Sequence, residues 1–252
     1  MDLPRGYISY NQINLYQTCP KKYYYTYVEE RIAPFNEKIF LGVVFHSVLE
    51  HYFQERIAGR SPTLEQVRHA FLDKFAFLQE EKETIWQTSS DQIRRRGLAF
   101  TDYFVRHLAE DIHPMMVEKE LETFIPEIGV TLKGIIDLVE EDFSLTDFKT
   151  TTSRWSSQRV ERSFLQMVIY KYLFEHVFEN ATRQLKLKIL YSTHSRNVRH
   201  QEIGLRSADA DLEGMLRVIG FVIEQIGQGI FYKQPSYMCG FCDFRDICGQ
   251  AT

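Results

Sequence analysis

The stretch TLKGIIDLVEEDFSLTDFKTTT, residues 131–152, decides the fold, because it contains two apolar, β-branched runs separated by an acidic turn at 140–142. Each run predicts a strand, and the two strands form a hairpin. Because side chains alternate along a strand, Asp147 and Lys149 share one face of the second strand. Closing the hairpin brings Asp137 of the first strand to the level of Asp147. The sequence therefore predicts two carboxylates and an amine side by side in an apolar sheet.

Around this hairpin, helices precede the strands and a long helix follows them. The expected helices lie at about 9–19, 42–58, 63–80, 91–112, 158–179 and 208–228, and the expected strands at 116–124, 130–140, 143–149, 184–192 and 199–205. The residues between these elements include no linker long enough to separate independent domains. We therefore expect residues 1–252 to form one mixed α/β domain with a helical insertion at 55–115.

The composition is that of an ordinary globular protein. Its 252 residues are 44% hydrophobic and 25% charged, which is enough for a full core. The net charge of −4 argues against a protein that coats polyanions with its whole surface, although it is compatible with a local basic groove. The sequence shows no apolar leader segment and no run of about 18 apolar residues, so we expect no membrane span and a cytoplasmic location.

The paired carboxylates indicate a divalent cation. Asp137 and Asp147 would repel each other unless a positive charge lay between them. Mg²⁺ binds carboxylate oxygens, keeps several waters and recruits phosphate oxygens, and Lys149 would then hold a water or a developing phosphate charge. The alternative is a buried salt bridge between Asp147 and Lys149, with Asp137 on the surface. The spacing of these residues alone does not choose between the two.

Three further polar side chains lie within apolar helices. His46 interrupts the helix 42–58, where a hydrogen-bonded core histidine is the simpler explanation. Gln166 and Tyr170 are four residues apart and therefore lie on one face of the helix that follows the strands, although they could simply mark its polar edge. In chain order, these motifs are a histidine, G-x-x-D, D-x-K and Q-x-x-x-Y.

This series resembles the PD-(D/E)XK nucleases, and specifically their RecB-type exonuclease branch. That branch combines a histidine on an early helix with three motifs, supplied here by His46, Gly134–Asp137, Asp147–Lys149 and Gln166–Tyr170. Each motif is loose alone, but four in this order are specific, and the resemblance extends from about residue 8 to 248. It implies a restriction-endonuclease-like fold, a mixed sheet core flanked by helices, with the catalytic core at 116–205.

The resemblance also implies roles for single residues. The divalent metal, Mg²⁺ or Mn²⁺, would be held by His46, Asp137, Asp147, the carbonyl of Phe148 and an acidic residue on the preceding strand. For that acidic residue we take Glu118, although Glu120 shares its strand face. Lys149 would orient or activate the attacking water, and Gln166 and Tyr170 would contact DNA. A bound cation lowers the pKa of water, and a fixed amine stabilises the charge that develops on phosphate.

Four cysteines form a second candidate site. Three lie in MCGFCDFRDIC with the spacing C-x2-C-x5-C, and one ends the first helix, giving the set Cys19, Cys239, Cys242 and Cys248. A tight C-x-x-C in an intracellular protein indicates metal binding rather than a disulfide. Four thiolates suit a structural zinc or an iron–sulfur cluster, and spacing alone slightly favours zinc.

The family resemblance favours iron instead. TCPKKYYY near the start, with C-x2-C-x5-C at the end, is similar to the [4Fe–4S] site of this branch, as in the helicase–nuclease subunit AddB and the CRISPR-associated RecB-like exonucleases. The cluster would join the chain ends, 1–30 and 230–252. Its role would be structural, because it closes a loop of about 220 residues.

Basic residues suggest where DNA would lie. They gather in 182–200, in the helical insertion and around the helix 158–179, and they are Arg183, Lys186, Lys188, Arg196, Arg199, Arg94, Arg95, Arg96, Arg154, Arg159 and Arg162. Lys186 and Lys188 share a strand face, and Tyr191 and Trp155 suit stacking of single-stranded bases. Any one of these clusters could instead be a solvated surface.

The expected function is therefore metal-dependent DNA exonuclease activity that prefers single strands or free ends. The alternatives are a structure-selective endonuclease on the same core and a catalytically quiet DNA-binding scaffold. The sequence has no G-x-x-x-x-G-K-[ST] phosphate loop, so a helicase would have to be a partner, and an integrase-type partner is also compatible. CRISPR adaptation, phage replication and DNA repair all use this architecture, and the residues do not choose among them.

Overall fold

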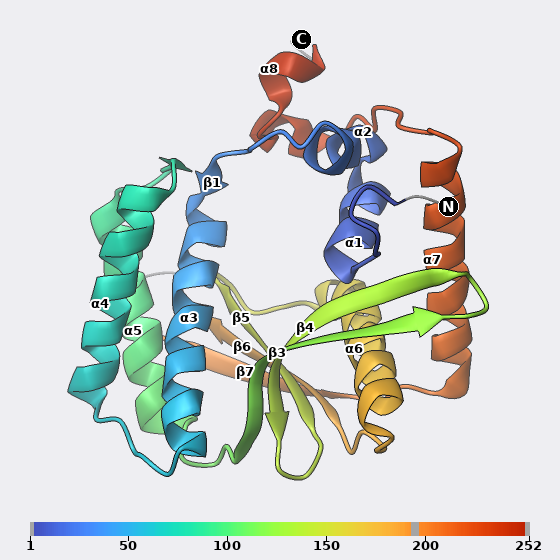
Figure 1. The fold of residues 1–252 in the computed structure, drawn as a ribbon. Coiled ribbons are helices and arrows are strands. Elements are labelled where there is room, and N and C mark those ends of the chain that lie inside the picture. The colour runs from blue at the N-terminus through green and yellow to red at the C-terminus, as the bar shows by residue number, and fades with distance from the viewer. Residues whose placement is uncertain (1–2, 193–196, 250–252) are drawn as a thin grey trace. The chain divides into compact units, whose positions relative to one another are not determined.

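The two strands of the predicted hairpin lie in a five-stranded sheet (Figure 1). The computed structural model describes residues 3–192 and 197–249. The strand order is β3-β4-β5-β6-β7, with bounds Pro114–Ile125, Val130–Glu140, Leu145–Thr151, Leu185–Tyr191 and Arg199–Leu205. β4 and β5 are antiparallel, as are β6 and β7, whereas β5 and β6 are parallel. The predicted mixed α/β fold is confirmed.

The chain divides into two units. The sheet unit comprises Phe35–Glu120 and Ile135–Arg206, and the terminal unit comprises Met1–Pro34, Leu121–Gly134 and Ser207–Thr252. β3 and β4 contribute residues to both units. The sheet unit contains all the residues predicted to bind the divalent metal, and the terminal unit contains all four cysteines.

Three helices of the sheet unit share one core with the strands. They are α3 (Glu37–Ile57), α4 (Leu64–Glu81) and α5 (Ser90–His107). Each begins after a polar residue whose side chain accepts backbone N–H bonds, namely Asn36, Thr63 and Ser89. Their buried apolar side chains pack in one cluster with Phe148 of β5 and Leu190 of β6. The predicted insertion therefore helps to support the strand that carries the D-x-K motif.

Gly97 allows these helices to approach closely. A Cβ at position 97 would lie 2.2 Å from Phe71 Cζ and 2.8 Å from Leu41 Cδ1, well inside van der Waals contact. Position 97 is buried, so the neighbouring side chains have little room to move away. A larger residue would therefore force α5 away from α3 and α4.

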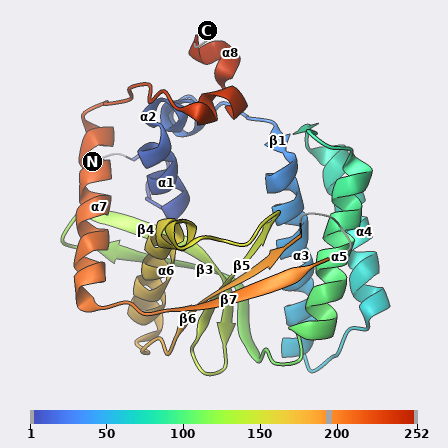
Figure 2. The same cartoon turned by 180° about the vertical axis from the view of Figure 1, so that it is seen from behind.

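The long helix α6 (Ser157–Phe178) connects β5 to β6. A parallel pair of strands requires such a crossover, and Figure 2 shows the chain leaving β5, running through α6 and returning as β6. Ser156 caps its start, and Glu179, in a left-handed conformation, ends it. Asp147 and Lys149 alternate with Phe148, so they face away from the core that α3, α4 and α5 share with the sheet.

The terminal unit links the beginning and the end of the chain. Its helices are α1 (Tyr10–Thr18), α2 (Pro20–Tyr23), a π-helical turn (Tyr24–Val28) and α7 (Asp209–Gly227). Tyr16 Oη donates a hydrogen bond to the Ile230 carbonyl at 2.6 Å, and the Tyr23 ring stacks on Phe231. These contacts place the first helices beside the segment that leads to the C-terminal cysteines.

The structure differs from the sequence expectation in short segments and at element ends. The helix expected to reach 112 ends at His107, because β3 begins at Pro114. Two strands of two residues, β1 (Phe35–Asn36) and β2 (Thr84–Ile85), pair in parallel but are too short to show a period. The tail beyond residue 228, where no helix was expected, contains the 3₁₀ helix η2 (Tyr237–Phe241) and α8 (Arg245–Cys248). Within the described residues, no helix combines the length and hydropathy needed to cross a membrane.

Candidate metal centre and active site

The two charges of β5 form an ion pair. Lys149 Nζ lies 2.9 Å from Oδ1 and 2.8 Å from Oδ2 of Asp147. Asp147 is fully buried, whereas 27% of the Lys149 side chain is exposed. A buried carboxylate depends on such a partner, because removing it would leave an uncompensated charge. The salt bridge considered as an alternative is therefore present, and it leaves an accessible ammonium beside a buried carboxylate.

Asp137 is buried beside this pair, not on the surface as that alternative required. The strands β4 and β5 pair at Leu138–Thr146 and Val139–Leu145. One residue further along β4, the Asp137 carboxylate accepts the Phe148 N–H at 2.8 Å. A side chain thus takes the place of a backbone acceptor, and this bond fixes the carboxylate between the two strands.

His46 reaches both strands from α3. Its Nε2 lies 3.0 Å from the Phe148 carbonyl oxygen, and its Nδ1 lies 3.3 Å from Glu118 Oε1 and 3.5 Å from Asp137 Oδ2. Among the described residues, His46, Glu118 and Asp137 are the one group of three whose ligand atoms all lie within 4.8 Å of one another. Asp147 is outside this group, with its oxygens against Lys149. The structure thus gathers the predicted ligands around the imidazole, with Asp147 adjacent.

The backbone of β3 decides which glutamate reaches the site. Regular alternation would put Glu118 and Glu120 on the same face of the strand. Glu118 instead has a left-handed backbone with φ of 44°, and its carboxylate lies against His46, whereas Glu120 is exposed. Non-glycine residues rarely adopt this conformation, and they concentrate at functional sites. A strand pattern read from the sequence does not reveal such an interruption.

The carboxylates of this site perturb the neighbouring titrations. Burial acts to lower the pKa of His46, but the charges of Asp137 and Glu118 outweigh burial and raise it to about 9. Burial also raises the pKa of Asp147 to about 6, although the Lys149 ammonium opposes that shift. Three carboxylates thus share two basic groups. Carboxylate and carbonyl oxygens with one imidazole, carrying excess negative charge, fit a divalent cation.

Two polar side chains of α6 lie close to these carboxylates. Gln166 Nε2 donates a hydrogen bond to Tyr170 Oη at 2.7 Å, and both side chains are buried. Burial raises the pKa of Tyr170 well above its ordinary value, and the charges of Asp137 and Asp147 add to the shift. The phenol therefore stays protonated. Its own O–H is available to a ligand, because Gln166 is the donor in their bond.

The four cysteines line one small cavity in the terminal unit. The cavity has a volume of about 30 Å³, and its lining includes Cys19, Cys239, Cys242, Cys248, Lys22, Lys233 and Arg245. All four are free thiols, and burial raises the pKa of Cys242. In the described residues, no three of the sulfurs lie within 4.8 Å of one another. The four thiols therefore line one cavity without forming a closed metal cage in the described residues.

The prediction of a basic groove along residues 182–200 is wrong for Lys186 and Lys188. Lys186 Nζ pairs with Glu140 at 3.0 Å, and Lys188 Nζ pairs with Glu202 at 2.7 Å. Both lysine side chains are largely buried, because β6 is an interior strand of the sheet. Their acidic partners come from β4 and β7, which the local sequence could not indicate. Arg196 lies outside the described residues.

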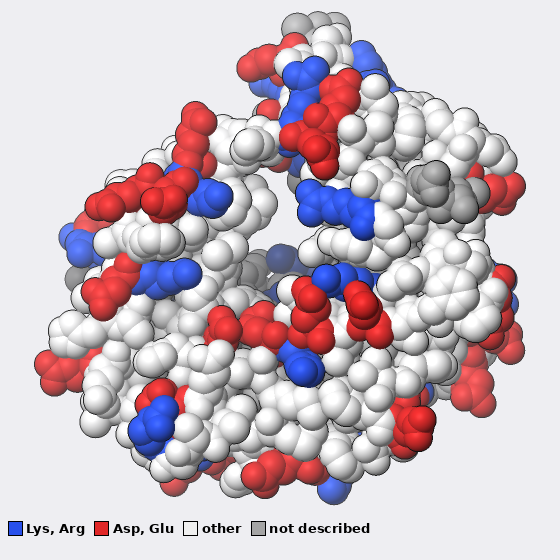
Figure 3. All heavy atoms as spheres, viewed as in Figure 1, with Lys and Arg blue, Asp and Glu red and all other residues white. Residues whose placement is uncertain are grey.

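Several arginines of the other two basic clusters also contact partners within the protein. Arg94 and Arg95 pair with Asp91 at 2.5 and 2.7 Å. Trp155, expected to stack on bases, is buried and has the Arg159 guanidinium 4.5 Å above its ring. On the face shown in Figure 3, acidic and basic side chains are interspersed, with no extended field of one sign. Any DNA contact outside the metal centre must therefore be local.

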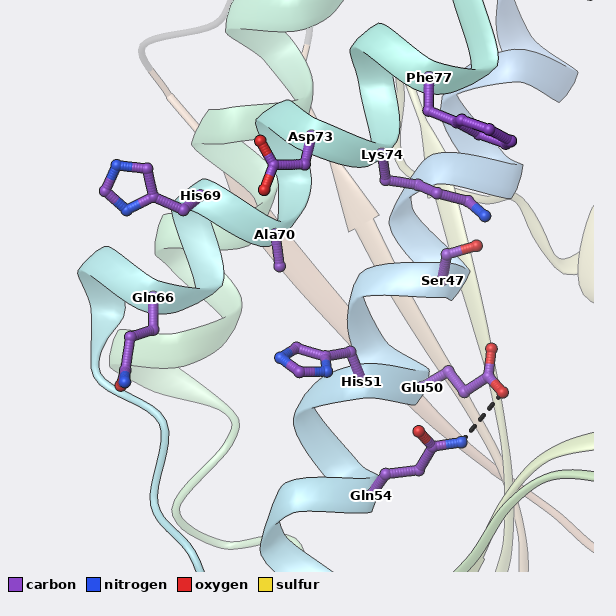
Figure 4. Close-up of a pocket in the computed structure, with 10 residues that line it drawn as sticks. All are labelled: Ser47, Glu50, His51, Gln54, Gln66, His69, Ala70, Asp73, Lys74 and Phe77. Atoms are coloured by element: carbon purple, nitrogen blue, oxygen red, sulfur yellow. Dashed lines mark hydrogen bonds between the residues drawn. The ribbon is translucent and has the colours of Figure 1, made fainter. Parts of the chain in front are cut away.

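A larger cavity of about 740 Å³ lies between α3 and α4 (Figure 4). Its lining includes the titratable side chains of Glu50, His51, His69 and Asp73 but none of the predicted site residues. In Figure 4 these side chains are spread along the two helices, and they form no group of three metal ligands within the described residues. The sequence did not predict this cavity, and it lies apart from the predicted metal ligands.

Comparison with known proteins identifies the family and the fold. The profile of the PD-(D/E)XK nuclease superfamily matches residues 7–249. No curated protein matches the chain. The crystal structure of "Putative exonuclease" from Eubacterium rectale shares the fold, with a TM-score of 0.64 and 10% identity over 98% of this chain and 90% of that chain. The crystal structure of "SSO0001" aligns over 97% of this chain and 86% of that chain at 15% identity, but its TM-score of 0.42 supports no argument.

The family match covers almost the whole chain, and the five-stranded mixed sheet flanked by helices is the restriction-endonuclease-like fold that the sequence predicted. Members of this family use divalent metals and act on DNA, in keeping with the acidic group around His46. The chain belongs to the PD-(D/E)XK nuclease superfamily.

Proposed function

We propose that this protein is a metal-dependent nuclease that hydrolyses phosphodiester bonds in DNA. The observation that carries the proposal is the convergence of His46, Glu118 and Asp137 beside the Asp147–Lys149 pair. These residues come from α3, β3, β4 and β5, so the fold brings them together from distant parts of the sequence. Carboxylates gathered in a partly buried site are unfavourable unless a cation compensates them.

The site fits Mg²⁺ or Mn²⁺. The proposed ligands are His46, Glu118, Asp137, the Phe148 carbonyl oxygen and Asp147. When bound, the cation supplies a lowered pKa for a water ligand and neutralises charge on the phosphate. Asp137 is positioned for this role by the Phe148 N–H, and His46 by the Phe148 carbonyl. Residues that bind metals are commonly oriented in this way by further hydrogen bonds.

Lys149 provides the fixed positive charge. Asp147 holds its ammonium at 2.8–2.9 Å, which restricts the lysine without burying it fully. An ammonium in this position stabilises negative charge as it develops on the phosphate and orients the attacking water. Tyr170 remains protonated and can donate a hydrogen bond to a phosphate oxygen, with Gln166 fixing the phenol.

The test of this proposal is cleavage of single-stranded DNA with Mg²⁺ or Mn²⁺. Lys149→Ala should abolish cleavage, and it should leave the fold intact because Asp147, whose pKa burial already raises to about 6, can protonate in its place. The matched control is Lys186→Ala, which removes another lysine paired with a buried carboxylate, that of Glu140. Wild-type turnover in Lys149→Ala would remove the nuclease assignment.

We further propose that the enzyme is an exonuclease of the RecB-type branch acting on single strands with free ends. The Eubacterium rectale protein of the same fold carries the name "Putative exonuclease", and the four motifs resemble those of that branch. Linear and circular single-stranded DNA separate the alternatives. An exonuclease degrades the linear form alone, a structure-selective endonuclease also opens the circle, and a scaffold binds without cutting. Unwinding or integration would be supplied by a helicase or integrase-type partner, since the chain has no phosphate loop.

We also propose that the four cysteines hold a [4Fe–4S] cluster that stabilises the terminal unit. Support comes from the single cavity that the four cysteines share and from the similarity of their spacing to the motif of the RecB-type branch. A four-iron cluster binds one thiolate at each iron, which matches a set of four cysteines. Metal analysis of the purified protein and its absorbance at about 400 nm test this proposal. One zinc per chain in a colourless protein would exclude iron and leave a four-cysteine zinc site.

A further inference from the structure

A second polar cavity lies where β5 ends. It has a volume of about 150 Å³ and is lined by the N-terminal turn of α3, by one face of α5, by the last residues of β5 with the one that follows, and by the start of α6. The polar lining residues are Glu37, Lys38, Arg96, Thr150, Thr151, Thr152 and Arg159. This volume is large enough to hold one tetrahedral oxyanion.

The charge of this cavity is positive. Lys38, Arg96 and Arg159 contribute three cations, and within the described residues none of them has a carboxylate within 4.0 Å. Glu37 is the one carboxylate in the lining. Its Oε2 already accepts bonds from the Gln87 N–H, the Thr88 N–H and the Thr88 hydroxyl, which offset its charge. The cavity therefore carries an excess of positive charge.

Arg96 is the residue that most clearly lacks a partner. Its Nε is buried and has no hydrogen-bond acceptor in the part of the chain that the structure describes. A buried charged donor without an acceptor is costly, so such groups usually meet a bound ion or a ligand. Arg95, one residue earlier, is exposed and paired with Asp91. The difference lies in the helix face, because Arg96 is on the side of α5 that carries Ile93 and Phe100.

Arg159 is held in position on the other side of the cavity. Its Nη1 donates to the Thr151 hydroxyl at 3.2 Å, and its guanidinium lies 4.5 Å above the Trp155 ring. Burial lowers the pKa of Arg159 from its ordinary value, which agrees with a partly desolvated cation. Two guanidinium groups with neighbouring threonine hydroxyls form the donor set that recognises phosphate oxygens.

We propose that this cavity, defined by Arg96, Arg159 and Thr151, is a second anion site that binds a phosphate group of the nucleic-acid strand beside the scissile one. Thr151 is two residues beyond Lys149 on β5, or about 7 Å along the strand. A phosphate bound there would be a close neighbour of the phosphate at the metal centre. This inference rests on the proposed nuclease function and adds to it a subsite that positions the strand. The phosphate could belong to an internal phosphodiester or to a strand end.

Inorganic phosphate tests the cavity without reference to cleavage. The probe is sodium phosphate against sodium chloride at equal ionic strength, with thermal unfolding of the full chain as the measurement. Phosphate should raise the Tm of the wild type and of Arg95→Gln but not that of Arg96→Gln. Equal responses of the three proteins, or no response in any of them, would overturn the anion site. If Arg96→Gln does not fold, Arg159→Gln with Arg154→Gln as its control gives the same comparison.

Binding of short oligonucleotides in EDTA then tests the role of the site and identifies the source of the phosphate. Arg96→Gln should weaken binding roughly tenfold or more and reduce the slope of log K against log salt by about one, whereas Arg95→Gln should behave like the wild type. A loss seen only with strands that carry a terminal phosphate identifies the end as the ligand, and an equal loss without it identifies an internal phosphodiester. If wild type binds DNA and Arg96→Gln binds equally well, this inference alone fails. If the wild type binds no DNA either in EDTA or with Ca²⁺ in place of Mg²⁺, the proposed function fails as well.

Discussion

The two candidate sites are held in place in opposite ways. At the metal centre, protein groups already fix the side chains, as when the Phe148 N–H holds Asp137 and the Phe148 carbonyl holds His46. Those side chains stand on long elements, such as the 21-residue α3. The cysteines lie in or next to the helices α2, η2 and α8, which have only four or five residues each. Helices that short are unstable on their own.

This difference predicts different roles for the proposed divalent metal and the proposed cysteine-bound cofactor. The sheet unit has a continuous apolar core beneath its site, so we expect the proposed metal to be required for chemistry but not for folding. The cysteine cavity is surrounded by short helices, so we expect the proposed cofactor to contribute directly to folding. Removing the divalent ion should therefore stop cleavage and leave the fold intact. Removing the cysteine-bound cofactor should loosen the terminal unit.

Asp137→Asn should strongly reduce activity by weakening metal binding. The asparagine oxygen can still accept the Phe148 N–H, so the local structure is kept while one negative charge is lost. We expect cleavage to fall by at least about a hundredfold and binding of Mn²⁺ to weaken in titration calorimetry, with little change in Tm. Glu120→Gln, which changes an exposed carboxylate of β3, is the control. Unchanged metal binding in Asp137→Asn would show that the ion lies elsewhere.

Cys242→Ser should have the largest effect on stability. It removes one of the four proposed ligands of a cofactor that would join residue 19 to α8, and losing a comparable cross-link costs about 2–5 kcal/mol. Hydrogen exchange should become faster in the terminal-unit helices α1 and α7 but stay unchanged in α3. Asp137→Asn, which keeps all four cysteines, is the matched control. Hydrogen exchange that rises equally in both units would mean that the cysteine ligands do not stabilise the terminal unit specifically.

Gly97→Ala probes the packing that orders the sheet unit. The added methyl group meets Phe71 and Leu41 at less than van der Waals distance, so we expect a loss of about 1–3 kcal/mol and a Tm lower by several degrees. Gly42→Ala on α3 is the matched control, because a Cβ there has no neighbour within 4 Å. It should raise stability by about 1 kcal/mol through helix propensity. A Gly97→Ala protein as stable as Gly42→Ala would contradict the close packing of α5.

The sequence predicted those parts of the fold and site that depend on local periodicity. Alternation in β5 places Asp147 and Lys149 on one face, and their ion pair agrees with this placement. The four-residue spacing of Gln166 and Tyr170 brings their side chains together on α6. The cysteine pattern identified four thiols that line one cavity. In each case the prediction depended on residues close together in the sequence or on a regular spacing between them.

The parts that could not be predicted depend on partners far apart in the sequence. Lys186 and Lys188 form a basic pair in the local sequence, but Glu140 and Glu202 from other strands neutralise them. The choice of Glu118 depends on a single left-handed residue within a strand. Arg96 is one of three adjacent arginines, and only its place on the inner face of α5 separates it from Arg95. The repeat of apolar residues at 93, 97 and 100 could have indicated that face.

The smallest predicted effect is a pH-dependent response to Mg²⁺. In the metal-free protein, the pKa of His46 is raised to about 9 from its ordinary 6.5, so its contribution to stability is complete below about 6.5 and is lost as pH rises through about 9. The pKa of Asp147 is raised to about 6 from 3.8, so its contribution is lost as pH rises from about 3.8 through about 6. Both shifts make the metal-free site less stable at higher pH. A bound cation replaces the missing positive charge, and its binding releases protons.

The increase in Tm caused by Mg²⁺ should therefore grow between about pH 5 and pH 9, by a few degrees. His46→Gln should remove the part of this growth above about pH 6.5, since Asp147 has already ionised there. Cys242→Ser should keep the full pH dependence in the sheet unit even as it destabilises the terminal unit. An Mg²⁺ increment that is constant with pH would mean that the ion does not displace protons from these groups. It would then have to bind away from His46. The idea that the residues around His46 form a preassembled metal centre, in contrast to the cysteine site, would be wrong.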